Sequence, residues 1–565
     1  MPESVFPAPA PAPAPAPGPE PGPGPEAPPR EQLSAVLDEA HVGDIHGALG
    51  TIRVGDVGYR RTWKQRLLTL LAIMGPGLIV MVGDNDAGGV ATYAQAGQNY
   101  GYSLLWTLLV LIPVLIVNQE MVVRLGAVTG VGHARLINER FGRFWGFFSV
   151  GDLFILNFLT LVTEFIGVSL SATYFGVSPY LVVPLAALVL VGIALTGNFQ
   201  RWERAMFVFL VFNLLVLPLA WLSHPDGGAV VRGFLVPGVA GGVSSDAVLL
   251  IIAIVGTTVA PWQLFFQQSN VIDKRITPHW MAYERTDTII GAFVVVLGAA
   301  AIMMAAAAAF GGTPDAGLFT DALGTASGLA AQIGPAVGAV FGLLLLDASI
   351  IGACAVTLAT SYAFGDVFGL RHSLHRSFGE ARVFYGSYTT MVVLAAAIVL
   401  IPHAPLGLIT TAVQALAGVL LPSATVFLVL LCNDREVLGP WVNATWLNVV
   451  ATVIVSVLLE LSLVLVVTTL VPSMDVGLLV VVLSVLLTVA LVAGAAWLWW
   501  PGRGRPPQPP LPPGDRENWR MPPVALLNRP EWSAGRKMAI LALRGYLVVA
   551  VVLLVVKAVQ LALGQ

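Results

Sequence analysis

Long apolar stretches recur along most of the chain, separated by short polar or basic segments. They cover residues 68–83 with 88–101, then 104–123, 144–173, 180–197, 205–222, 246–269, 287–310, 334–365, 384–402, 405–431, 446–471, 476–500 and 538–562. Each has roughly the 17–25 residues that a helix needs to cross a bilayer, or more. The pattern therefore predicts an all-α polytopic membrane protein with about twelve spanning helices and a thirteenth, less regular candidate at the C-terminal end.

Composition divides the chain into five segments. Residues 1–30 alternate proline with alanine or glycine, which is typical of a disordered tail and unlike a signal peptide. We expect residues 31–66 to be a cytoplasmic N-terminal segment and residues 67–500 to be the membrane domain. A proline-rich basic linker follows at 501–536, and residues 537–565 are a candidate additional transmembrane or interfacial helix.

The overall composition narrows the class of protein. Of 565 residues, 56% are hydrophobic and 11% charged, whereas soluble domains carry about 25% charged residues. A formal net charge of −3 provides no dense basic face for nucleic acid. We expect Cys354 and Cys432 to be packed core residues, because two distant thiols make neither a disulfide framework nor a zinc site.

The basic residues predict an orientation. Loops expected on one side of the membrane hold Arg53, Arg60, Arg61, Lys64, Arg66, Arg124, Arg135, Arg140, Arg143, Arg201, Arg204, Lys274, Arg275, Arg285, Arg371, Arg376 and Arg382. The opposite loops hold few, with Arg232 as the exception. By the positive-inside rule, we expect a multi-pass protein of the plasma membrane with a cytoplasmic N-terminus.

Two apolar stretches contain residues that weaken a helix in mid-membrane. The first includes GDNDAGG at 83–89, and the sixth includes GTTVAPWQ at 256–263. Non-helical backbone at this depth survives only when it is buried in protein or lines a polar cavity. Breaks in the first and sixth helices are typical of inverted-repeat transporters, which bind their cargo between two unwound helices. Glycines for close helix packing are the alternative, but packing does not call for two aspartates.

Within the first twelve expected spans, away from their ends, the charged residues are all acidic. They are Asp84, Asp86, Glu164, Asp347 and Glu460, and each costs at least about 2.5–3.5 kcal/mol at such depth. Charges of one sign cannot pair with each other, so they indicate a path for a cation. The alternative is a protonated acid that hydrogen-bonds a neighbouring helix, which is our interpretation of Glu460. Carboxylates, freed carbonyls and the Gln263 amide are the ligands of a hard divalent cation.

These motifs resemble those of the NRAMP family of divalent metal transporters over roughly residues 65–500. The first span reads GPG at 75–77, DAGG at 86–89, QAG at 95–97 and GYSLLW at 101–106, and the sixth reads APWQ at 260–263. The tenth carries Gln414 and Pro422, followed by DREVLG at 434–439. The resemblance implies a LeuT-like inverted repeat of five plus five helices with about two extra, and no cofactor beside the transported ion.

The resemblance also implies a metal site. Asp86 matches the family's metal-binding aspartate, and Gln414 matches a glutamine that approaches the metal. Gly83 and Thr257 match positions whose carbonyl groups face the site.

Several positions depart from the family pattern. Ala260 stands at the family's methionine and Gln263 at its sixth-helix asparagine, while Gly89 replaces another asparagine. Asp84 adds a carboxylate. The loss of the thioether removes the ligand that favours soft metals.

Proton coupling is the second property that the departures affect. Glu164 matches a third-helix acid, but Leu161 and Trp262 stand where the family has an aspartate and a histidine. The pattern is similar to the NRAMP-related magnesium transporters. It predicts uptake of Mg²⁺ and Mn²⁺ with little or no proton coupling, with Glu164, Asp347 and Trp262 as candidate pathway or relay positions.

Other functions remain open at this point. One is a proton-coupled Mn²⁺ or Fe²⁺ symporter of the ordinary family type, and another is a sodium-coupled symporter for an organic solute that shares only the fold. Nothing positive indicates a receptor or scaffold. The chain has no His-Glu-x-x-His, phosphate-binding loop or nucleophile elbow, so we do not expect an enzyme. The expected partners are a divalent metal ion and the lipid bilayer, without nucleic acid.

Overall fold

The computed structural model describes residues 39–56, 58–401, 406–471, 473–499, 515–527, 540–541 and 545–546. The expected disordered tail (1–30), most of the expected linker (501–536) and most of the candidate C-terminal helix (537–565) lie outside these residues, so those expectations stay predictions.

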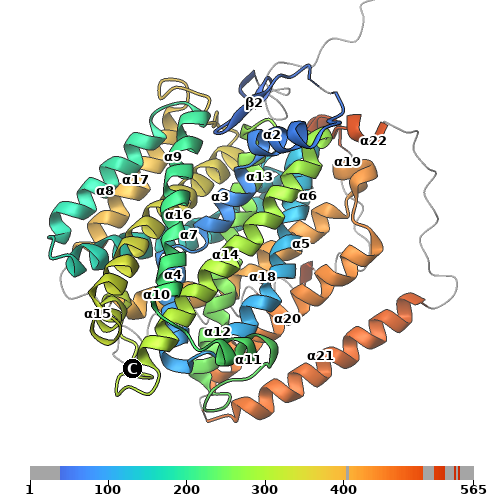
Figure 1. The fold of residues 1–565 in the computed structure, drawn as a ribbon. Helices are drawn as coiled ribbons and strands as arrows, with labels where there is room; N and C mark the ends of the chain where they lie inside the picture. The colour runs from blue at the N-terminus through green and yellow to red at the C-terminus, as the bar shows by residue number, and fades with distance from the viewer. Residues whose placement is uncertain are drawn as a thin grey trace, which may run out of the picture.

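The described chain is a bundle of helices with one small β-hairpin at one end (Figure 1). Its longer helices are α2 (Trp63–Ile73), α3 (Pro76–Gly83), α4 (Ala87–Tyr100), α5 (Leu105–Thr129), α6 (His133–Phe141), α7 (Arg143–Tyr174), α8 (Pro179–Ala194), α9 (Phe199–Phe212), α10 (Val216–Leu222), α11 (Gly227–Leu235), α12 (Ser245–Thr258), α13 (Pro261–Asp273), α14 (Met281–Phe310), α15 (Ala322–Gln332), α16 (Pro335–Phe368), α17 (Arg382–Val399), α18 (Leu406–Cys432), α20 (Thr445–Leu470) and α21 (Val476–Trp499). Short helices α19 (Arg435–Leu438) and α22 (Asp515–Asn518), and 3-10 turns that include η2 (Asn213–Leu215), complete the helical elements.

The number of candidate membrane-spanning helices is close to the prediction of about twelve. Ten described helices are long and apolar enough to cross a bilayer, or eleven if α2 and α3, which meet at a 54° bend, form one span. Helix α8 is also apolar but has only 16 residues, just below the usual length of a spanning helix. The predicted twelve is reached only if α8 also crosses the membrane.

Local signals explain where the central helices begin. Thr62 and Gln65 form a capping box at the start of α2, Asp86 caps α4, and Pro261 occupies the first turn of α13. These residues satisfy or remove backbone N–H groups that the first turn of a helix leaves free.

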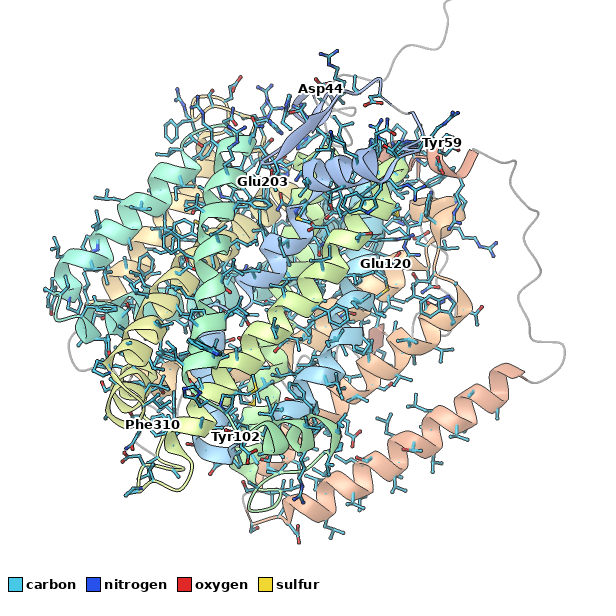
Figure 2. The ribbon with its side chains drawn as sticks, viewed as in Figure 1. Asp44, Tyr59, Tyr102, Glu120, Glu203 and Phe310 are labelled. Carbon is cyan, nitrogen blue, oxygen red and sulfur yellow. The ribbon has the colours of Figure 1, made fainter. Side chains whose placement is uncertain are left out.

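The hairpin was not predicted from the sequence. Strands β1 (Ile45–Gly47) and β2 (Gly50–Ile52) are antiparallel, with Ile45 opposite Ile52, and both isoleucines are buried. The hairpin packs on α2 and α9. It marks one end of the molecule, which we call the hairpin end; Asp44 and Glu203 lie there, whereas Tyr102 and Phe310 lie at the opposite end (Figure 2).

The broken helices form the centre of the bundle. Helix α4 packs against α12, α14 and α18, and α3 packs against α13, α14 and α16. Helix α21 runs along the outside (Figure 1), where its large side chains are exposed. Both cysteines are buried and free, which confirms their predicted role as core residues.

Candidate functional site

Both predicted interruptions are present. Helix α3 ends at Gly83 and α4 begins at Ala87, so Asp84, Asn85 and Asp86 lie between two helices. Helix α12 ends at Thr258 and α13 begins at Pro261.

The two breaks lie against each other. The Tyr93 hydroxyl of α4 is 2.8 Å from the Thr258 hydroxyl at the end of α12. A methyl group added at Gly89 would lie 2.7 Å from the carbonyl oxygen of Asp84 and 3.0 Å from the Thr257 hydroxyl. Segments about 170 residues apart in sequence therefore meet at one point, as predicted.

The two aspartates of the first break differ in their surroundings. Asp84 is fully buried, and neither of its carboxylate oxygens has a hydrogen-bond partner in the described structure. Asp86 is also buried, but its Oδ1 accepts a hydrogen bond from the N–H of Gly89 at 2.6 Å. Asp86 thus caps α4, whereas the Asp84 carboxylate has no such partner; the metal-binding roles of both stay predictions.

Glu164 of α7 joins this pair. Its Oε2 accepts a hydrogen bond from the N–H of Ala87 at 3.1 Å, and its carboxyl group lies beside that of Asp86. The glutamate therefore contacts the backbone at the C-terminal end of the first break.

Gly352 of α16 is a site residue that sequence reasoning missed. A Cβ atom there would lie 2.7 Å from Asp86 Cβ and 2.8 Å from Glu164 Oε2, so only glycine lets α16 approach both acids. The run of small residues IGACA at 351–355 was the available signal, since small residues mark close helix contacts in membranes.

Amide side chains complete the site. Gln414 of α18 lies against Gly88, where an added methyl group would collide with it, and its Nε2 finds no partner among the described residues. Gln263 Oε1 accepts a hydrogen bond from Gln119 Nε2 of α5 at 3.1 Å, and Gln119 is a second residue that the sequence did not indicate. The carbonyl of Ala260 accepts the N–H of Gln263 at 3.2 Å, so the first turn of α13 already uses one lone pair.

The remaining predicted residues lie differently. The Trp262 ring packs on Gly83, 3.3 Å from where a Cβ would be. Asp347 precedes Gly352 by five residues, which turns it roughly 140° around α16 from the acids; its role stays a prediction. Glu460 Oε1 accepts a hydrogen bond from Ser484 of α21 at 2.5 Å, so it bonds a neighbouring helix as expected.

The donor set suits a hard, partly hydrated cation. Within the described residues, no three His, Cys, Asp or Glu side chains are grouped closely enough to hold a metal by themselves. An ion here would need the two aspartates together with amide, hydroxyl and carbonyl oxygens and water. The residues of the two breaks, 84–86 and 259–260, include no methionine, cysteine or histidine.

A cavity of about 350 Å³ approaches the site from the opposite end. Gln95, Asn99, Tyr100, Asp246, Leu249, Leu250, Gly317 and Thr411 line it. Gln95 follows Asp86 on α4 and Thr411 precedes Gln414 on α18, so the cavity lies along the helices that carry the site. The Thr411 hydroxyl donates to Gln95 Oε1 at 3.1 Å, and both residues line the cavity.

Comparison with known proteins identifies the family. The family model "Natural resistance-associated macrophage protein-like" matches residues 77–468, more than half of the chain and including both breaks. The chain belongs to the Nramp family.

Two kinds of relative support this membership. The divalent metal cation transporter MntH of Staphylococcus aureus strain Mu3 is 25% identical over 438 residues, which cover 73% of this chain and 93% of that protein; MntH of strain COL is 26% identical over the same length. A crystal structure of the Eremococcus coleocola manganese transporter has a TM-score of 0.59 at 21% identity and covers 79% of this chain and 98% of that one. A point mutant of the same transporter gives a TM-score of 0.61 at 20% identity, over 82% and 98% of the two chains.

This membership confirms several sequence predictions. The Nramp chain is a multi-pass membrane protein with a LeuT-like fold, and it is a divalent metal transporter, not an enzyme. The expected absence of a cofactor agrees with the family. The sodium-coupled organic solute symporter is therefore excluded as a reading of this chain.

Proposed function

We propose that this Nramp protein carries hard divalent cations, Mg²⁺ and Mn²⁺, into the cell with little or no proton co-movement. One observation carries the proposal: the polar side chains gathered at the two breaks offer a cation only oxygen ligands. They are Asp84, Asp86, Glu164, Thr257, Gln263 and Gln414. Ala260 and Trp262 occupy the positions where the sequence pattern of the family has sulfur and imidazole.

Magnesium chemistry favours this set of ligands. Mg²⁺ binds through one or two carboxylates and keeps several waters, so it needs negative charge and space more than it needs many direct ligands. The unpartnered Asp84 carboxylate supplies charge beyond that of Asp86. The small side chain of Ala260 leaves room for water. Mn²⁺ also accepts oxygen ligands and is expected to pass.

A proton-coupled manganese symporter is the second candidate. It is favoured by the names of the relatives, which are divalent metal cation and manganese transporters, and by Glu164, whose carboxyl group lies beside Asp86. A relay from the site needs titratable groups in sequence. Leu161, one turn before Glu164, is fully buried and apolar, and this favours uptake without proton coupling.

We further propose a plasma-membrane location with the hairpin end in the cytoplasm. Arg204 Nε donates to the carbonyl of Ala48, and Arg275 donates to the carbonyls of Ala40 and Asp44. Two of the expected basic loops therefore contact the N-terminal segment directly. These contacts support the view that the basic loops lie on one side of the membrane, which is the basis of the proposed orientation.

Transport by the purified protein in liposomes tests the proposal. Uptake of Mg²⁺, Mn²⁺, Ca²⁺ and Cd²⁺ is measured with a pH indicator inside the vesicles. We expect Mg²⁺ and Mn²⁺ to enter without acidification. If the lumen acidifies in step with Mn²⁺ entry, and millimolar Mg²⁺ neither enters nor competes, the protein is the proton-coupled manganese symporter.

A further inference from the structure

A second group of buried charged residues lies toward the hairpin end, outside the site described above. It consists of Glu203 of α9, Lys274 at the end of α13, and Glu284 and Asp287 of α14, each at most 1% exposed. Glu203 lies beside the hairpin in Figure 2, where its Oε2 accepts the N–H of Ala48 at 2.5 Å. Charges buried so completely need partners or a ligand.

The one positive charge of this group, on Lys274, already has partners. Lys274 Nζ is 2.5 Å from Glu203 Oε1 and 2.8 Å from the carbonyl oxygen of Met74. If ionised, the three acids and one lysine carry two uncompensated negative charges. A single divalent cation would neutralise them.

The two other acids have unfilled oxygen atoms. Neither oxygen of Glu284 has a hydrogen-bond partner in the described part of the chain, and Asp287 Oδ1 has none either. Asp287 Oδ2 accepts the N–H groups of Gly75, Gly77 and Leu78, at 3.0, 2.8 and 3.3 Å, and so holds the start of α3. An unpartnered, fully buried carboxylate is costly, which points to a bound cation rather than to packing.

A polar stripe on α13 connects this group with the central site. Gln263, Gln267, Asn270 and Lys274 are spaced by four, three and four residues, which places them on one face of a helix. All four are at most 1% exposed. Gln267 Oε1 and both polar atoms of Asn270 lack partners within the described residues.

The stripe meets α14 at the acids. Gln267 Nε2 donates to the hydroxyl of Thr288, the neighbour of Asp287, at 2.9 Å. The amide of Gln267 also lies beside Glu284, although no hydrogen bond of normal geometry joins them. Buried polar side chains therefore follow one face of α13 from Gln263 in the central site to Gln267, which lies beside Glu284.

We propose that Glu284 and Asp287, with the amides of the α13 stripe, form a second binding site for a partly hydrated divalent cation on its way from the central site to the hairpin end. This inference rests on the proposed function. Two carboxylates without a third metal-binding side chain leave most of the ion's coordination to water. Such a site binds weakly enough for the ion to leave.

The same arrangement links the ion to the first broken helix. The three N–H groups at the start of α3 use Asp287 Oδ2, and Oδ1 remains for the cation. A cation on Oδ1 draws negative charge from the carboxylate and so weakens the hydrogen bonds that hold the start of α3. This group was not predicted, because the apolar pattern placed the start of the seventh span at 287, whereas α14 begins at Met281.

Counting bound Mn²⁺ tests the site directly. The full-length protein in detergent is titrated with Mn²⁺ and the free ion is followed by electron paramagnetic resonance. We expect two ions per chain in the wild type and one in Asp86→Asn. We expect the remaining ion to bind about tenfold more weakly or not at all in Asp86→Asn with Glu284→Gln, because a buried negative charge is lost without a change of shape.

A matched control separates the site from a general loss of charge. Glu460→Gln removes another acid from a membrane-spanning helix, but its partner is Ser484 of α21, so both ions should remain. Glu284→Asp keeps the charge and should keep the second ion even if Glu284→Gln folds poorly. Two results would overturn the proposal. One is that the wild type binds a single ion, which is lost in Asp86→Asn. The other is that Asp86→Asn binds one ion with an affinity that does not change when Glu284→Gln is added.

Transport distinguishes this inference from the proposed function. Glu284→Gln in liposomes should lower the maximal rate of Mn²⁺ uptake and change its KM little, because the ion still enters through the central site. If the wild type binds two ions but transports none, the proposed function fails and the second site stands. If the wild type transports and Glu284→Gln matches it in rate and in bound ions, the second site fails alone.

Discussion

The two helix breaks differ in what they contribute. The first consists of three polar residues, Asp84, Asn85 and Asp86, and brings two buried carboxylates into the membrane domain. The second consists of Val259 and Ala260, followed by Pro261, and brings no charge. Changes in the first break should therefore alter whether a cation binds, whereas changes in the second should alter which cation is preferred.

The breaks are also held in different ways. The start of α4 depends on a hydrogen bond from the N–H of Gly89 to the Asp86 carboxylate, so a candidate ligand is also a helix cap. The start of α13 depends on proline, which needs no cap and has no N–H to satisfy. The first break can thus lose structure when a ligand is removed, and a test of binding there must preserve the cap.

The largest effect is expected for Asp86→Asn. Asparagine caps a helix about as well as aspartate, so α4 should remain intact while the site loses one negative charge in a low-dielectric environment. We expect loss of Mn²⁺ and Mg²⁺ uptake in liposomes, with an unchanged thermal unfolding midpoint.

Asp84→Asn serves as the comparison within the same break. It removes the unpartnered carboxylate and leaves the cap untouched, so uptake should fall while α4 is unaffected. If Asp86→Asn transports like the wild type, the first break is not the source of binding charge and the comparison between the breaks fails.

The next largest effect is expected for Gly352→Ala. The added Cβ would lie 2.7 Å from Asp86 Cβ and 2.8 Å from Glu164 Oε2, so α16 or the two acids must move. Overpacking of this kind destabilises a protein by about 1–3 kcal/mol, and here it would distort the first break. Uptake should drop severely, as measured by the initial rate of Mn²⁺ entry.

Gly386→Ala on α17 is the matched control, because a Cβ there meets no atom within 4 Å. It should transport normally. Equal rates for Gly352→Ala and Gly386→Ala would show that α16 does not restrict the acids.

Most of the fold and the positions of the two helix breaks could be predicted, for a physical reason. A membrane imposes helix lengths on apolar stretches, and glycine, proline and aspartate stand out against them, so both breaks were found. The oxygen-ligand set followed from residue type alone. The pattern of apolar and polar residues reflects the free-energy cost of placing each side chain in lipid.

Features that depend on contacts between distant segments were not predictable in this way. Gly352 matters only because α16 approaches Asp86, and Gln119 only because α5 faces Gln263. The Glu203–Lys274 ion pair lies at the ends of helices, where charged residues are ordinary. The hairpin has two three-residue strands, too short for an alternating pattern to be distinguished from a loop.

A change in preference, rather than a loss of transport, is expected for Ala260→Met in the second break. It would add a thioether beside the first break, and soft ligands favour cadmium over magnesium. We expect the ratio of Cd²⁺ to Mg²⁺ uptake to rise by about tenfold, which corresponds to about 1.4 kcal/mol, in competition assays with both ions.

Ala260→Leu controls for size, since leucine fills similar space without sulfur. It should reduce uptake of all ions without favouring cadmium. If the leucine variant shifts the ratio as much as the methionine variant, the second break selects by volume alone and not by ligand chemistry.

The smallest effect is expected for Tyr93→Phe, which removes the hydrogen bond that joins the two breaks. The Thr258 hydroxyl donates its proton to the carbonyl of Ile254 at 2.6 Å, so the Tyr93 hydroxyl is the donor in the 2.8 Å contact with Thr258. Phenylalanine keeps the ring and leaves behind only an acceptor with an unused lone pair. A hydrogen bond of this kind contributes about 0.5–1.5 kcal/mol, and we expect a loss of uptake of a few-fold or less.

The double variant Tyr93→Phe with Ala260→Met tests whether the two breaks act independently. If the first break sets binding charge and the second sets ion preference, the free-energy effects of the two changes on the Cd²⁺ to Mg²⁺ uptake ratio should add to within about 0.5 kcal/mol. A larger deviation from additivity would mean that the Tyr93–Thr258 contact lets one break set the preference of the other, and the division of roles between them would have to be abandoned.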